Sequence, residues 1–158
     1  MGMYAHYLPI GGDELEGLIH KVKWGEMTMS EYLDKRSEDR SAPRKFMLER
    51  SWPGIHYILN QDKWGGTTTL KYAVFGEADL GEVVCYYGPV RYLRYPLLSE
   101  TAGALSLVIR EWMETQFNYR QMIDADVIYA GPDFEIYWNE FNRLRDFHLV
   151  ASPRATAS

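Results

Sequence analysis

Two long apolar stripes run through the C-terminal half of the chain and restrict the folds open to it. In residues 99–117 and in residues 133–148, apolar side chains recur three and four positions apart, the spacing of one face of an α-helix. The inward positions are Ala102, Leu105, Val108, Ile109, Trp112, Met113 and Phe117 in the first stripe, and Phe134, Tyr137, Trp138, Phe141, Leu144 and Phe147 in the second. The pattern predicts two amphipathic helices that frame one core.

The rest of the chain predicts shorter elements. An aromatic strand is expected near the N-terminus, followed by a helix whose apolar face is Leu15, Leu18, Ile19 and Val22. The densely charged residues 35–45 predict an exposed connection, preceded by a helical turn at 29–33. A short helix is expected from Pro53, with Ile55, Ile58 and Leu59 inward, and a brief helix over residues 70–75 that Gly76 ends in a left-handed conformation.

These segments predict an α+β fold in which a small, mainly antiparallel sheet packs against several helices. The sheet is expected from residues 3–8, 83–87 and 90–93, and the covering helices from residues 13–22, 99–117 and 133–147. A single domain is expected over residues 1–150, with a disordered tail over residues 151–158. A mainly helical protein with one hairpin is the competing architecture.

Charge and composition exclude several function classes. The 158 residues carry 22 acidic and 17 basic side chains, a formal net charge of −5, whereas nucleic acids and anionic membranes are bound by basic surfaces. No apolar run is long enough to span a membrane, and the single cysteine, Cys85, excludes an internal disulfide framework. We therefore expect a cytoplasmic protein that binds neither nucleic acid nor membrane.

Motifs that carry a catalytic mechanism are absent. The chain has no phosphate-binding loop, nucleophile elbow, metalloprotease helix or calcium loop. The four histidines, His6, His20, His56 and His148, lie far apart and none pairs with another at a metal-ligand interval, although distant residues can still assemble a zinc site. Cys85 lies in an apolar run typical of a core strand. We predict no metal and no cofactor, and leave catalytic residues unassigned.

The segment from Tyr86 to Tyr95 holds four tyrosines and two arginines. On a strand, Tyr87 and Arg91 would face one side and Tyr92 and Arg94 the other. Guanidinium groups beside phenol rings can stack and bind anions, and this composition is enriched in protein interfaces. The same residues can instead form an aromatic core in which an arginine holds a loop.

His56 also has two interpretations. Trp52, Tyr57 and Asn60 share its short helix, so the imidazole can be a proton carrier or a ligand-binding group that titrates near neutrality. Alternatively, His56 packs against tryptophan and hydrogen-bonds a backbone carbonyl group. The second interpretation is the more common one for a lone histidine on an apolar helix.

Several segments together resemble the bacterial YfbM-like proteins, which have no established reaction. They are Leu48-Glu49-Arg50-Ser51-Trp52-Pro53-Gly54-Ile55-His56-Tyr57-Ile58-Leu59, Phe75-Gly76, Tyr87-Gly88-Pro89-Val90-Arg91-Tyr92-Leu93 and Ala125-Asp126-Val127-Ile128-Tyr129. The resemblance implies a compact α+β domain. Some members of this family lie near toxins, which suggests an immunity or inhibitor role. Where the family closes with an apolar strand, this chain has only His148-Leu149-Val150, which would leave a sheet edge exposed or covered by another element.

The leading hypothesis is a non-catalytic protein that binds a basic protein partner, such as a toxin, as an inhibitor or immunity factor. Its expected contacts are Tyr87, Arg91, Tyr92, Arg94 and Tyr95, with Trp52 and Trp64 as secondary candidates. The alternative is an enzyme or sensor for a nucleotide or anionic metabolite, in which His56, Tyr87 and Arg91 line one pocket. A homodimer that self-associates through the aromatic run is a third possibility, so monomer and homodimer both stay open.

Overall fold

The C-terminal helix α8 (Phe134–Ala151) is the element around which the main core is built. The computed structural model describes residues 4–43, 45–85 and 88–152. Tyr137, Phe141, Leu144 and His148 are buried along one face of α8, as the periodicity requires, and Asp133 accepts a hydrogen bond from the Glu135 amide at the helix start. The second predicted helix is therefore confirmed, and the α+β class with it.

This helix is longer than predicted. Residues 148–150 are helical, so the suggestion that they form a short closing strand is wrong. Ala151 ends the helix, and residues 153–158 of the expected tail lie outside the described residues.

The first apolar stripe folds as two helices, α5 (Leu97–Ser106) and α6 (Arg110–Gln116), where one was predicted. Two consecutive β-branched residues, Val108 and Ile109, weaken the helix at the break, and Ile109 has extended backbone angles. Val108 and Met113 lie about 140° apart on a straight helix, yet both are buried. The break turns both into the core and leaves Ile109, predicted to point inward, 58% exposed.

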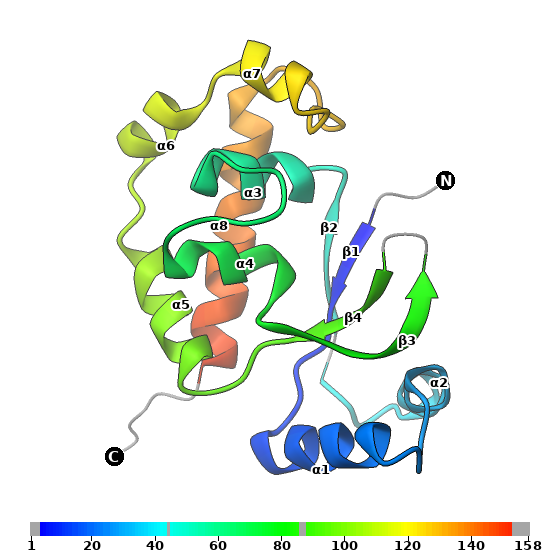
Figure 1. Ribbon diagram of the computed structural model, residues 1–158. Coiled ribbons are helices and arrows are strands. Elements are labelled where there is room, and N and C mark those ends of the chain that lie inside the picture. Colours follow the sequence, from blue (N-terminus) through cyan, green and yellow to red (C-terminus); the bar gives the residue numbers. More distant parts are fainter. Residues whose placement is uncertain (1–3, 44, 86–87, 153–158) are drawn as a thin grey trace.

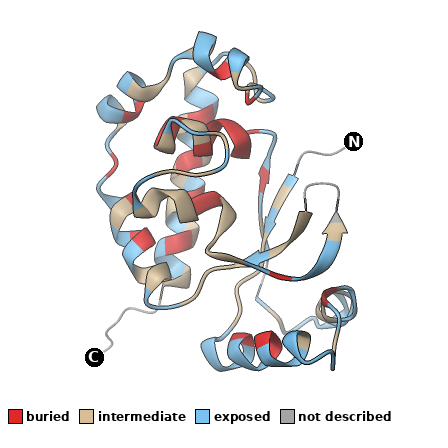
Figure 2. Ribbon diagram, in the orientation of Figure 1, coloured by how far each residue is buried: buried red, intermediate tan, exposed pale blue. Residues whose placement is uncertain are grey.

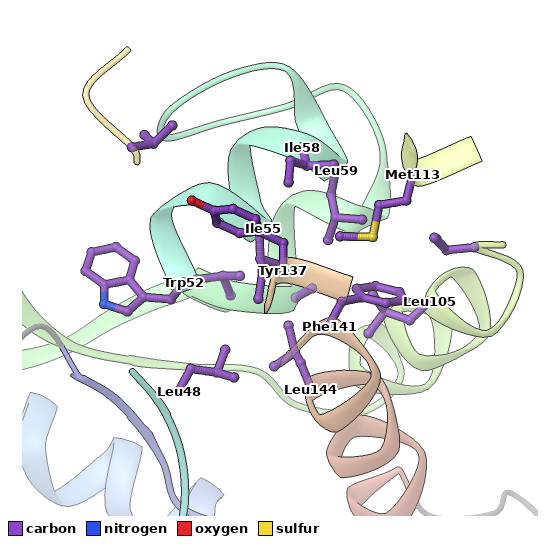
Figure 3. Packing of buried hydrophobic residues seen from close by; sticks show 14 of the residues in the cluster. Leu48, Trp52, Ile55, Ile58, Leu59, Leu105, Met113, Tyr137, Phe141 and Leu144 are labelled. Atoms are coloured by element: carbon purple, nitrogen blue, oxygen red, sulfur yellow. The ribbon is translucent and has the colours of Figure 1, made fainter. Parts of the chain in front are cut away.

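Helix α3 (Trp52–Asn60) packs across α8 and completes the main core. Ile55 and Ile58 are fully buried, as predicted, and Figure 3 shows them beside Tyr137 of α8. The further helix α7 (Tyr119–Asp124), which the periodicity did not indicate, contributes the fully buried Met122.

The strands form two separate antiparallel pairs, not the single sheet that was predicted. Strand β1 (Tyr4–Tyr7) pairs with β2 (Phe46–Glu49), and β3 (Ala78–Cys85) pairs with β4 (Gly88–Tyr92). Sequence reasoning missed β2 because it is only four residues long and buries one side chain, Leu48.

A second, smaller core lies where helices α1 (Gly12–Lys23) and α2 (Met29–Glu38) meet β3 (Figures 1 and 2). Its buried residues are Leu15, Leu18, Ile19, Met29 and Leu80. Helix α2 extends into the charged stretch that was predicted to be a connection. The carboxylate of Glu82 on β3 accepts hydrogen bonds from the Met29 and Ser30 amides, 2.9 and 3.1 Å away. These bonds from a distant side chain add to the local N-cap, Thr28, whose hydroxyl accepts a hydrogen bond from the Glu31 amide.

The described residues contain no helix long and apolar enough to cross a membrane.

Candidate functional site

Phe75 contacts three of the ring-bearing residues singled out from the sequence. It ends α4 (Tyr72–Phe75), which follows the short 3₁₀ helix η1 (Thr69–Lys71). The Phe75 ring centroid lies 4.5 Å from that of His56, 5.8 Å from that of Trp52 and 5.7 Å from that of Trp64. We call these four side chains the Phe75 cluster. Trp52 and His56 are buried, whereas Trp64 is 62% exposed, so the cluster reaches the surface at Trp64.

Gly76 connects this cluster to β4. Its φ of 70° is positive, as expected from the sequence, but its ψ of −167° lies outside the left-handed helical conformation that was predicted. A Cβ atom built there would lie 2.7 Å from the Tyr92 carbonyl oxygen. The next amide, that of Glu77, donates a hydrogen bond to the same oxygen at 2.7 Å. Because only glycine fits at this close approach, the end of α4 is held against the end of β4.

The side chain of Asp62 fixes the backbone of the loop that carries Trp64. Asp62 accepts hydrogen bonds from the amides of Trp64 and Gly65, at 2.9 and 2.7 Å, which forms an Asx turn. The hydrogen bonds from these two backbone amides hold the pKa of the Asp62 carboxyl group below its usual range, and the bond from Gly65 has the larger effect. Lys63 places its Nζ atom 5.5 Å from the Trp64 ring centroid, within range of a cation–π interaction.

The buried side chain of His56 also holds this loop. Its Nε2 atom lies 2.9 Å from the Gly65 carbonyl oxygen, and its Nδ1 atom lies 3.4 Å from the Asn60 amide nitrogen. A carbonyl oxygen only accepts, so this network assigns the proton to Nε2. Burial lowers the pKa of His56 to about 4, and the imidazole is neutral at pH 7. The geometry is that of a core histidine that is bonded to a carbonyl group and packs against the Phe75 ring.

Asn60 extends this support to the far side of the loop. Its amide nitrogen donates to the carbonyl oxygens of His56, at 3.0 Å, and Leu70, at 3.4 Å. Gly66 passes so close that a Cβ atom there would lie 2.5 Å from the Asn60 side-chain oxygen. The exposed Trp64 is therefore presented by a tightly packed loop.

Arg91 and Arg94 on the adjoining hairpin are already paired within the chain. Arg91 donates to the Phe75 carbonyl oxygen at 2.6 Å and to Asp79 at 2.5 Å. Arg94 donates to Glu16 at 3.1 Å, and its guanidinium group lies 5.5 Å from the Tyr92 ring centroid. Both arginine side chains stay about two-fifths exposed. A bound anion would have to compete with these carboxylates.

The structure thus brings part of the predicted set together. Trp52, His56 and Arg91 all contact Phe75, Arg91 through its carbonyl group. Tyr92 and Arg94 follow along the hairpin, and Tyr95 is 58% exposed. Tyr87 lies outside the described residues, and so does the Cys85 side chain. Their predicted roles stay predictions.

Sequence reasoning did not single out Phe75 as the centre, nor Asp79 and Glu16 as arginine partners. The only signal for Phe75 was its place in a family-like turn, and the carboxylates had no local signal.

Two surface hollows lie elsewhere, of about 510 and 840 Å³. The smaller is lined by Tyr57, Gln61, Gln121, Asp124 and Ala125, and neither is lined by His56 or Arg91. Across residues 4–43, 45–85 and 88–152, no group of three or more histidine, cysteine, aspartate or glutamate side chains is arranged to hold a metal ion.

A model of the family described as a domain of unknown function (DUF1877) matches residues 1–155. Neither the curated proteins nor the solved structures contain a match to this chain.

Proposed function

The chain belongs to the DUF1877 family, whose description names no activity, and from this premise we propose that it is a protein-binding module. The contact surface in this proposal is Trp64 with the exposed parts of Arg91, Arg94 and Tyr95. The partner is a basic protein, and binding inhibits it, as an immunity factor inhibits a toxin. We place the chain within the YfbM-like group and in the cytoplasm as part of the same proposal.

The observation that carries this proposal is an exposed tryptophan held in a fixed position. Trp64 is 62% exposed, yet the Asx turn at Asp62, the His56 hydrogen bond and the Phe75 ring hold it. Tryptophan and arginine are enriched among the residues that dominate binding energy. A side chain ordered before binding loses less conformational entropy when the complex forms. Trp64 has both properties of an interface anchor.

The charge around the surface favours a basic partner. Asp79 and Glu16 hold the two arginines and are themselves about 60% exposed. The chain as a whole carries a formal charge of −5. Long-range attraction would accelerate encounter with a cationic protein, and the association rate would fall as salt is added.

The enzyme or sensor alternative has less support. A proton carrier must titrate near the working pH, whereas burial lowers the pKa of His56 to about 4. An anion clamp needs free donors, whereas Arg91 already donates to Asp79 and to the Phe75 carbonyl oxygen. Both groups serve to hold the loop and the hairpin in place.

The experiment compares two exposed tryptophans in cells of the source organism. A photoreactive benzophenone amino acid replaces Trp64 in one variant and Trp24, which is 73% exposed at the end of α1, in the other. We expect position 64, but not position 24, to cross-link a protein with an excess of lysine and arginine. The purified partner should then bind Trp64→Ala about thirtyfold more weakly than Trp24→Ala, the factor that corresponds to a ~2 kcal/mol anchor.

Identical cross-links at both positions, or equal affinities of the two alanine variants, would refute the assignment of this surface. An association rate that does not change with salt would refute the electrostatic part of the proposal.

A further inference from the structure

The smaller hollow, of about 510 Å³, lies between the ends of two helices. Tyr57 belongs to the last turn of α3, and Gln61 is the C-terminal capping residue of that helix. Gln121 and Asp124 belong to the last turn of α7, and Ala125 caps it. The described residues that line the hollow therefore all come from helix C-termini. The volume is within the range of small-molecule sites.

Helix C-termini favour positive charge. The last carbonyl groups of a helix have no partner within the helix and carry a partial negative charge, so a cation is stabilised beside them. Many helices supply this cation themselves, as a lysine, arginine or histidine in the last turn. Neither α3 nor α7 has a basic residue in its last turn. The hollow thus collects the negative ends of two helices without a cation of their own.

Asp124 adds a full negative charge at the same place. A carboxylate in the last turn of a helix opposes the helix dipole and lowers stability. Asp124 is exposed, and its carboxylate has no hydrogen bond or ion pair within residues 4–43, 45–85 and 88–152. Residues that break a local rule without a compensating contact are typical of functional sites. Asp124 is also the one charged side chain among the described residues that line the hollow.

The basic residues that are nearest in sequence do not balance this charge. Arg120 precedes Asp124 by one helical turn, the spacing of a helix ion pair, but no ion pair joins these two described side chains. Lys63, on the α3 side, places its ammonium group over the Trp64 ring. Neither residue lines the hollow. The hollow therefore keeps a net negative charge.

The neutral groups of the hollow add hydrogen-bond acceptors and a ring. Gln61 directs its side-chain nitrogen to three backbone carbonyl oxygens, at 3.3, 3.2 and 3.1 Å. Its side-chain oxygen has no donor in the part of the chain that the structure describes, so it stays available as an acceptor. Gln121 brings a second amide, and the half-buried Tyr57 brings an aromatic ring, a group on which planar cations stack.

We propose that this hollow binds a guanidinium group, from an arginine side chain or from a small guanidinium compound. The cation lies against the Asp124 carboxylate and the C-terminal ends of α3 and α7, and its N–H groups donate to the amide oxygens of Gln61 and Gln121. A guanidinium group suits these acceptors better than an ammonium group, because it is planar and can pair with a carboxylate through two N–H donors. This site is separate from the surface around Trp64, and either proposal can fail without the other.

The test uses blocked amino acids that differ in their side-chain group. N-acetyl-arginine amide carries the guanidinium group, and N-acetyl-citrulline amide has nearly the same shape without the charge. Binding to the full chain is followed by nuclear magnetic resonance, through the backbone amides of Gln121 and Ala125. We expect the arginine probe to bind at least fivefold more tightly than the citrulline probe, the factor for ~1 kcal/mol from one exposed ion pair. N-acetyl-lysine amide should bind more weakly than the arginine probe.

Methylguanidinium, which lacks the amino-acid part, separates the two sources of the group. Affinity equal to that of the arginine probe supports a small guanidinium compound as the ligand, whereas tighter binding of the arginine probe supports a side chain.

Asp124→Asn keeps the shape of the side chain and removes its charge, so it should abolish the preference for arginine over citrulline. Its carboxylate has no internal contact to lose, and thermal unfolding checks that the variant folds. Asp34→Asn is the matched control, because Asp34 is exposed on α2, at the opposite end of the molecule from α7 (Figure 1). No binding of the arginine probe, affinity for it equal to that for the citrulline or the lysine probe, or equal effects of the two variants would each overturn the proposal.

Discussion

Mild acid should destabilise this protein, and His56 should account for a defined part of the loss. The imidazole is fully buried, and burial lowers its pKa from 6.5 to about 4, against a smaller opposite effect of the Gly65 hydrogen bond and of nearby Asp62. The unfolded chain therefore binds a proton on His56 that the folded chain excludes. The stabilising contribution is fully present above pH 6.5 and is lost as pH falls toward 4.

The size of the effect follows from the two pKa values. A shift of one pKa unit corresponds to about 1.4 kcal/mol, so the full contribution is about 3 kcal/mol. Integration of proton binding gives a loss of about 2 kcal/mol between pH 7 and pH 5. Such a loss is a large share of a typical unfolding free energy.

The assay is urea unfolding at pH 7, 6 and 5 for three proteins: the parent, His56→Gln and His20→Gln. His56→Gln removes the titration, and its free energy of unfolding should fall about 2 kcal/mol less than that of the parent between pH 7 and pH 5. His20 is exposed on α1, so His20→Gln should follow the parent. Because each protein is compared with itself at the different pH values, any pH-independent effect of the substitution on its unfolding free energy cancels.

Burial also lowers the pKa of His148, so a residual pH dependence is expected in the His56 variant. The reasoning would be refuted if His56→Gln lost as much stability as the parent between pH 7 and pH 5.

Two further predictions concern packing and capping. Gly66→Ala would place Cβ 2.5 Å from an oxygen of Asn60 and should lower the unfolding free energy by about 1–3 kcal/mol. Gly103→Ala, in an open helical position, should raise the unfolding free energy by about 0.5–1 kcal/mol. Thermal or urea unfolding compares the two variants, and equal effects would contradict the close packing at Gly66. Backbone N–H groups lower the pKa of Glu82 from 4.5 to about 2, so its capping of α2 should persist above pH 4.5 and be lost as pH falls toward 2. Glu82→Gln should weaken amide protection in the first turn of α2 already at pH 6, measured by hydrogen exchange, and unchanged protection would show that this cap is dispensable.

Elements with a local cause were predictable from the sequence. The apolar period of α8 and the proline at the start of α3 act through neighbouring residues, and the positive φ of Gly76 reflects a helix end that glycine tolerates. Each of these features depends on atoms within a turn or two of the chain.

Elements with a distant cause were missed or misjudged. Strand β2 exists because β1 pairs with it. At the start of α2, Glu82, more than 50 residues away, adds two hydrogen bonds to the local cap that Thr28 provides. The break between α5 and α6 coincides with two β-branched residues, but the burial of Val108 and Met113 in one core depends on the segments that pack against them. Pairing, capping at a distance and core packing all depend on where other segments lie.

The same distinction between local and distant causes applies to the candidate site. Sequence reasoning named Trp52, His56, Trp64 and Arg91 because aromatic, imidazole and guanidinium groups are chemically conspicuous wherever they occur. It grouped Trp52 with His56 on one helix, and one of its alternatives placed His56 and Arg91 in one pocket. Their meeting around Phe75 and the burial that keeps His56 neutral depend on the tertiary structure. The partnering of Arg91 with Asp79 depends on it as well, through the β3–β4 register. Local periodicity and side-chain chemistry are properties of the chain, whereas contact, burial and the resulting protonation state arise only when distant segments pack together.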